Sequence, residues 1–151
     1  MRIATTSRVG AATRGLGLAA VLLASACLQS TAPQPSVLQL SGAWNYTGVQ
    51  TAPVRAALTG TLTISRESGT SFQGRLDLTS ADQQTGVPTL LTGLVSGSAS
   101  GTDVIDFDAD LDLVRRHVGQ IVADTITGTW IGSAPDGTMS SGTFRVEREP
   151  R

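Results

Sequence analysis

The chain has little of several residue types that commonly carry protein chemistry. Its 151 residues include one cysteine, one histidine and no lysine, and only 4% are aromatic. A single cysteine excludes an intrachain disulfide, so a hydrophobic core alone must hold the fold. A metal cluster or catalytic triad would have to be built around His117, and no Gly-x-Ser-x-Gly motif accompanies it. We therefore expect His117 at the surface beside a turn, no cofactor or metal, and no enzyme activity.

Long hydrophobic runs are also lacking. The Leu- and Ala-rich stretch Gly15–Ala26 has 12 residues, whereas a transmembrane helix needs roughly 20. It follows three arginines and ends in small residues, which is the pattern of an exported protein's signal peptide. We predict a signal peptide over 1–26, a polar tether containing two prolines over 27–37, and one folded domain over 38–148.

The lone cysteine ends this signal. The run from Leu22 to Cys27 resembles the lipobox of bacterial lipoproteins, although Ala24 stands where that family usually has leucine. The resemblance implies a lipid-modified cysteine with fatty acyl chains such as palmitate, cleavage before Cys27, and anchoring in the cell envelope. In a host with an outer membrane, Leu28 implies attachment to that membrane on its periplasmic side. Ala24 to Ala26 also reads as an ordinary cleavage site, which would give a secreted protein instead.

Charge is sparse and mildly acidic. Removing residues 1–26 takes away three arginines and no acids, leaving eight arginines against 12 acidic residues, a balance of about −4. Nucleic-acid binding depends on a basic surface, so we expect no nucleic-acid partner. The same balance disfavours flat binding to anionic lipid, and the N-terminal lipid is the expected membrane contact.

What the chain does have is alternation of apolar and polar residues. The period of two predicts eight short strands, joined by turn-length links, in an antiparallel meander. Such a meander removes its exposed edges by closing, so we predict a small eight-stranded up-and-down β-barrel, with a β-sandwich as the alternative. Residues 111–122 are the one segment that could compete as a helix. The predicted strands cover residues 38–47, 58–65, 72–79, 90–98, 105–113, 117–123, 125–132 and 140–147.

A weak repeat accompanies the strands. Residues 40–44, 58–62, 126–130 and 140–144 each place a glycine two residues before a large apolar side chain. Glycine inside a strand costs stability, so its recurrence on the inward face predicts tight coiling or close backbone approach in a narrow barrel.

The first strand carries Gly42-Ala43-Trp44, which resembles the Gly-x-Trp that closes the barrel base in the calycin-like barrels, the lipocalins and avidins. The resemblance implies non-catalytic binding of a small apolar or amphipathic molecule in the lumen. The long first loop and C-terminal helix of lipocalins are missing, and no residue set matches an avidin biotin site. The inward side chains either plug the lumen or line an open one. The lumen candidates are Trp44, Tyr46, Leu62, Phe72, Phe107, Trp130 and Phe144.

An acidic ladder gives the alternative function. Carboxylates two residues apart on a strand lie about 6.6 Å apart in a line, too spread to encircle one cation. We expect a solvated outer face whose acids pair with Arg75, Arg115 or Arg116. Such a face suits a structural or protein-interaction module that meets an envelope partner. The interaction-face candidates are Asp106, Asp108, Asp110 and Asp112.

Overall fold

The described residues of the computed structural model, 39–101 and 103–150, form strands joined by turns. The predicted signal peptide, Cys27 and the whole of the predicted tether lie outside these residues. Within them, no helix is long and apolar enough to cross a membrane. The strands are β1 (Gly42–Ala52), β2 (Ala56–Ser68), β3 (Ser71–Asp82), β4 (Pro88–Ala99), β5 (Val104–Asp110), β6 (Val114–Val122), β7 (Thr125–Ser133) and β8 (Met139–Arg148).

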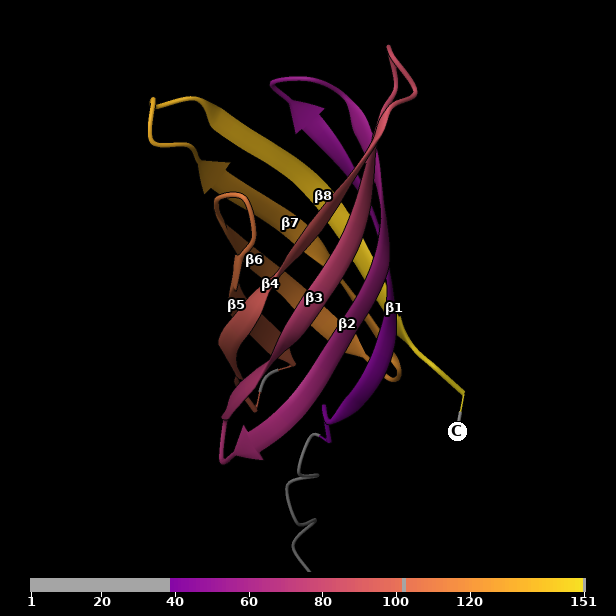
Figure 1. The fold of residues 1–151 in the computed structure, drawn as a ribbon. Helices are drawn as coiled ribbons and strands as arrows, with labels where there is room; N and C mark the ends of the chain where they lie inside the picture. Colours follow the sequence, from indigo (N-terminus) through magenta and orange to yellow (C-terminus); the bar gives the residue numbers. More distant parts are fainter. Residues whose placement is uncertain (1–38, 102, 151) are drawn as a thin grey trace, which may run out of the picture. The chain divides into compact units, whose positions relative to one another are not determined.

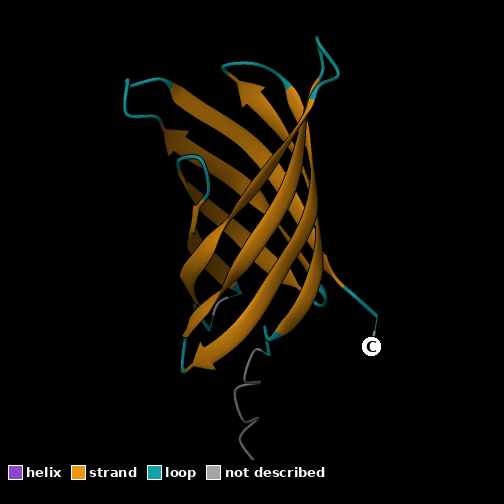
Figure 2. Ribbon diagram, in the orientation of Figure 1, coloured by secondary structure: helices purple, strands orange, loops and turns teal. Residues whose placement is uncertain are grey.

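The strands close into one antiparallel barrel in chain order, and β1 completes the ring by pairing with β8 (Figure 1). This confirms the eight-stranded up-and-down barrel over the sandwich. Figure 2 shows only strands and loops in the part of the chain that is described. Residues 111–122 form a turn and strand β6, so the competing helix does not occur.

Alternation places the apolar side chains in the interior. β6, for example, alternates strictly between exposed and buried residues from Val114 to Val122. The glycines of the repeat allow the strands to coil tightly. A Cβ on Gly60 would overlap the carbonyl oxygen of Asp77, and one on Gly128 would overlap that of Val118. The close backbone approach predicted for these glycines is therefore confirmed.

One end of the barrel, near the turns at 69–70 and 123–124, is closed by Trp44. The indole is fully buried and donates from Nε1 to the carbonyl oxygen of Leu40 at 2.8 Å. Arg148 covers its ring, with the guanidinium carbon 4.2 Å from the ring centroid. That guanidinium also donates to the carbonyl oxygens of Ser41 and Gln39 and pairs with Asp124. We call this the closed end.

The structure corrects the sequence interpretation between β5 and β6. β5 ends at Asp110, so Asp112 lies in the turn at 111–113 rather than on the strand, and the amide of Leu111 bonds the carbonyl of Leu113 at 3.3 Å. β6 begins at Val114, three residues earlier than predicted. This change of boundary carries His117, predicted at the surface, fully into the interior.

Candidate functional site

The middle of the barrel is filled by contacting rings. His117 stacks on Phe107 with ring centroids 4.4 Å apart and meets Phe144 edge-on at 5.0 Å. Tyr46 stacks on Phe144 at 6.0 Å, and Phe72 meets Phe107 edge-on at 6.1 Å. These rings come from strands β1, β3, β5, β6 and β8, so one layer ties strands from all round the barrel together. We call it the aromatic layer.

His117 is fixed as a neutral ring within this layer. Its Nδ1 lies 3.0 Å from the carbonyl oxygen of Arg115, which can only accept, so Nδ1 carries the proton. Nε2 then accepts from the Tyr46 hydroxyl at 3.2 Å. Burial lowers the pKa of His117 to about 4, and burial also raises the pKa of Tyr46. The pair is therefore uncharged at neutral pH.

A second polar group lies beside the aromatic layer, on strands β6, β7 and β8. Arg115 is only 4% exposed, and its guanidinium carbon stands 4.8 Å from the Trp130 ring centroid. Its Nη2 donates to Asp112 in the β5–β6 turn at 2.9 Å. On β7, Gly132 pairs with Arg115 of β6 and with Ser140 of β8. Arg115, Gly132 and Ser140 therefore lie in one inward-facing row across the three strands. We call Arg115, Trp130 and Ser140 the Arg115 corner.

The corner holds buried donors that the fold leaves unpaired. Among the described residues, Nε and Nη1 of Arg115, Nε1 of Trp130 and the hydroxyl of Ser140 have no hydrogen-bond partner. Buried polar atoms in proteins are nearly always paired, and those that are not call for an explanation. All four of these atoms can donate a hydrogen bond.

The end opposite Trp44 is less uniformly buried. It carries the turns at 53–55, 83–87, 111–113 and 134–138, three of which stand clear at the top of Figure 1. Three inward positions at this end, Gln50, Ser80 and Leu91, are half-buried, whereas Ala56 and Leu58 stay buried. We call it the mouth end, and the Arg115 corner lies on its side of the aromatic layer.

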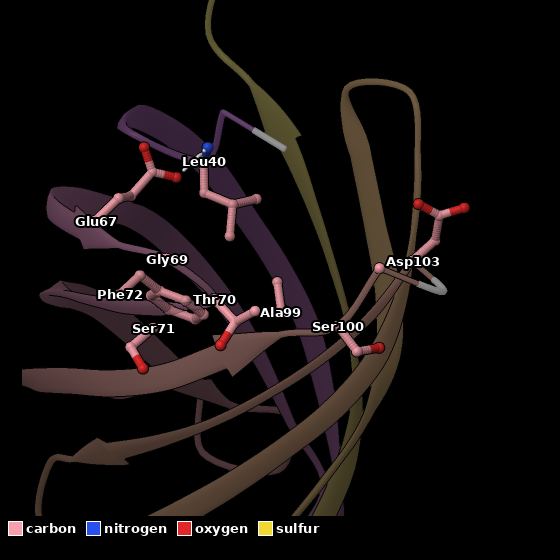
Figure 3. Close-up of a pocket in the computed structure, with 10 residues that line it drawn as sticks. Leu40, Glu67, Gly69, Thr70, Ser71, Phe72, Ala99, Ser100 and Asp103 are labelled. Carbon is pink, nitrogen blue, oxygen red and sulfur yellow. Dashed lines mark hydrogen bonds between the residues drawn. The ribbon is translucent and has the colours of Figure 1, made fainter. Parts of the chain in front are cut away.

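A surface depression of about 170 Å³ lies at the closed end (Figure 3). Leu40, Phe72 and Ala99 form its apolar side, and Glu67 stands at its edge. The Glu67 carboxylate accepts from the Leu40 amide and from the Ser41 hydroxyl at 2.5 Å. Burial raises its pKa, but these hydrogen bonds outweigh that effect and lower it overall. Glu67 thus holds the residues that lead into β1.

All the lumen candidates lie inside the barrel, as the alternation predicted. Tyr46, Phe72, Phe107 and Phe144 meet in the aromatic layer, and Trp130 borders it through His117, with centroids 6.3 Å apart. The others, Trp44 and Leu62, are paired neighbours on β1 and β2 toward the closed end, and both are fully buried.

Sequence reasoning missed Arg115, His117 and Ser140 as interior residues. The sequence did contain a sign of their burial. Arg115 and His117 continue, at a spacing of two residues, the series of Gly119 and Ile121, which were expected on a strand. The pair Arg115-Arg116 reads as a turn by composition. Because Arg115 occupies a position of this series, the alternation itself indicated that its side chain points into the barrel.

Asp106, Asp108 and Asp110 lie on the outer face of β5, but Asp112 does not continue the ladder. Asp106 pairs across to Arg116 on β6 at 2.5 Å, and that arginine holds the pKa of Asp106 below its usual value. Asp112 meets Arg115 from the turn, and Asp108 and Asp110 are exposed on β5. Arg75 pairs instead with Asp77 on its own strand at 3.0 Å. Within 39–101 and 103–150, no three His, Cys, Asp or Glu side chains are placed to hold a metal ion.

No family model matches the chain, and no curated protein matches it. Among solved structures it is similar to EF1p2_mFAP2b bound to DFHBI, with a TM-score of 0.59 and 11% identity over 73% of this chain and 94% of that chain. A redesigned beta barrel, b11L5F_LGL, gives 0.52 and 16% over 74% and 92%. The redesigned beta barrel mFAP1 bound to DFHBI gives 0.52 and 16% over 72% and 94%. At such low identities the likeness shows a shared β-barrel fold.

Proposed function

We propose that the protein binds a small apolar or amphipathic molecule inside the barrel, without catalysis, and admits it at the mouth end. The observation that carries this proposal is the asymmetry of the interior. Trp44 and Arg148 seal one end, whereas Gln50, Ser80 and Leu91 are half-buried at the other. The aromatic layer lies between the two ends, and a molecule that enters at the mouth end would pack against it. Two similar barrels, EF1p2_mFAP2b and mFAP1, are bound to DFHBI, which supports binding of a small molecule by such a fold.

A non-catalytic role is supported by the state of the one histidine. His117 has both nitrogens engaged, by a carbonyl oxygen and by Tyr46, and its low pKa keeps it neutral. A general base must reach the proton that it removes. Both nitrogens of His117 are occupied inside the fully buried aromatic layer.

The cellular setting is part of the same proposal. The lipobox-like run ending at Cys27 supports attachment of the barrel to the cell envelope through an N-terminal lipid, with residues 27–37 as the tether. The burial of Trp44 beneath Arg148 supports the resemblance of Gly42-Ala43-Trp44 to the calycin-like barrels. The ligand would then be a molecule of the envelope, such as a lipid fragment.

Native mass spectrometry of the chain from Leu28 onward, purified from its host without added lipid or detergent, tests the proposal. We expect a reproducible extra mass that disappears on denaturation. The matched variants are Phe144→Asp, in the aromatic layer, and Arg145→Asp on the outer face of the same strand. The first should lose the extra mass and the second should keep it. A bare polypeptide mass in the wild type, even after incubation with octanol, would contradict the proposal.

The outer face of β4, β5 and β6 supports a second candidate, docking of an envelope protein. Leu94 and Val114 are 71% and 52% exposed and flank Asp110 in one row of the sheet. Asp108 and Asp110 line the same shallow groove. If this face binds a partner, Asp108→Asn with Asp110→Asn should lose the partner in a pull-down, and added salt should weaken it. The same double variant should leave binding inside the barrel unchanged.

A further inference from the structure

The Arg115 corner specifies which chemical group a ligand should carry. Only 4% of Arg115 is exposed to solvent. Of its three side-chain nitrogens, only Nη2 donates a hydrogen bond, to Asp112. The neighbouring Trp130 ring faces the guanidinium at 4.8 Å and offers it no hydrogen bond. A buried guanidinium with two free nitrogens is a costly arrangement for a side chain with no further role.

The other free atoms of the corner have compatible chemistry. The indole Nε1 of Trp130 is a donor only, as are all nitrogens of arginine, and the hydroxyl of Ser140 can donate. The backbone of β8 passes closely behind the indole at Gly142, where a Cβ would lie 2.7 Å from Nε1. Four free donor atoms, two of them on the cationic guanidinium, favour an acceptor that is also an anion.

We infer that the Arg115 corner binds the carboxylate of an amphipathic ligand. This inference rests on the proposed function and adds the ligand's headgroup to it. A carboxylate has two oxygens that only accept, so it can take hydrogen bonds from the donors of Arg115 that Asp112 leaves free. The apolar part lies against Leu91 and Leu111, which are half-buried and pack on the core at the same end of the barrel.

Two ligands of equal chain length, octanoate and 1-octanol, separate the headgroup from the apolar part. The two indole N–H signals of the full-length, 15N-labelled protein in lipid nanodiscs report on the two ends of the barrel, since the chain has two tryptophans. We expect octanoate to shift the Trp130 signal and leave that of Trp44, whose N–H is bonded to Leu40. Octanoate should bind at least about tenfold more tightly than octanol, as a charge-assisted contact implies.

Two matched arginine variants test whether Arg115 causes the preference for octanoate over octanol. Arg115→Met removes the buried charge, and Arg116→Met removes the next charge along β6, which points outward and is 61% exposed. The preference for octanoate should vanish in the first and persist in the second. If Arg115→Met does not fold, Trp130→Phe and Ser140→Ala decide, because each deletes one donor and should reduce the preference several-fold.

The outcomes separate the two proposals. Equal binding of octanoate and octanol, or a preference that survives Arg115→Met, overturns the carboxylate site and leaves binding inside the barrel intact. Failure of both ligands to bind overturns both proposals. A Trp130 shift produced equally by octanoate and by chloride at the same concentration also overturns the carboxylate site, because a simple ion would then satisfy the corner.

Discussion

At the scale of the residue, the barrel interior contains polar side chains, such as His117 and Arg115, that pack against aromatic rings. His117 is kept neutral because its surroundings cannot solvate a charge, and the nearby positive charge of Arg115 acts in the same direction. Tyr46 and the carbonyl of Arg115 satisfy the neutral ring completely. The residue is therefore suited to hold the aromatic layer together, at the cost of sensitivity to acid.

That sensitivity is measurable. The pKa of His117 falls from an ordinary 6.5 to about 4 on folding, so the unfolded chain binds more protons between these values. Its stabilising contribution is complete above pH 6.5 and is lost as the pH falls toward 4, by roughly 3 kcal/mol in total. Urea unfolding from pH 7 to pH 4 should show a shallower loss in His117→Gln than in the wild type. Parallel pH profiles would show that His117 does not titrate on unfolding.

Arg148 is the residue on which the closed end depends. It covers Trp44 and donates to two carbonyl oxygens that precede β1, so Arg148→Ala removes a cation–π contact and several hydrogen bonds. We expect the free energy of unfolding to fall by about 2 kcal/mol. Arg145→Ala is the control, because Arg145 lies on the same strand and pairs only with Glu147 at the surface. Equal losses in the two variants, measured by urea unfolding, would contradict the role of Arg148.

At the scale of the element, glycine decides how tightly the strands coil. Gly60→Ala places a Cβ against the backbone of β3 at Asp77, so two paired strands must move apart. Overpacking of this kind costs about 1–3 kcal/mol. Gly101→Ala is the control, since nothing lies within 4 Å of the added carbon. Thermal unfolding should show a lower midpoint for the first variant only, and a neutral Gly60→Ala would mean that the pair can separate freely.

The strands also show how far sequence reasoning reaches. Alternation predicted the number and order of strands because each has one buried face, and a shift of one residue would expose it. It failed between Asp110 and His117, where Leu111 and Leu113 continue the alternation through a turn. The lumen candidates were found by the same rule, since they are apolar and in phase. Arg115 was missed because its burial depends on Trp130 and Asp112, which other segments supply.

At the scale of the whole molecule, closure makes the barrel self-sufficient. The pairing of β1 with β8 leaves no open sheet edge, and the core lies within the ring of strands. The described strands complete the sheet among themselves, and under the proposed lipidation an acyl chain would contribute about 0.8 kcal/mol per buried CH₂ without a contact from the barrel. Anchoring and folding should therefore respond to different substitutions.

Cys27→Ser tests this separation. In its host, the wild-type protein should incorporate labelled palmitate and sediment with membranes, whereas the variant should take up no label. Urea unfolding of the barrel should be the same in both, because the barrel is formed by strands from Gly42 to Arg148. Phe107→Asp is the converse control, since it disrupts the core and leaves the acylated segment unchanged. An unlabelled, soluble wild type with a reactive Cys27 thiol would instead indicate ordinary cleavage after Ala26 and a secreted barrel.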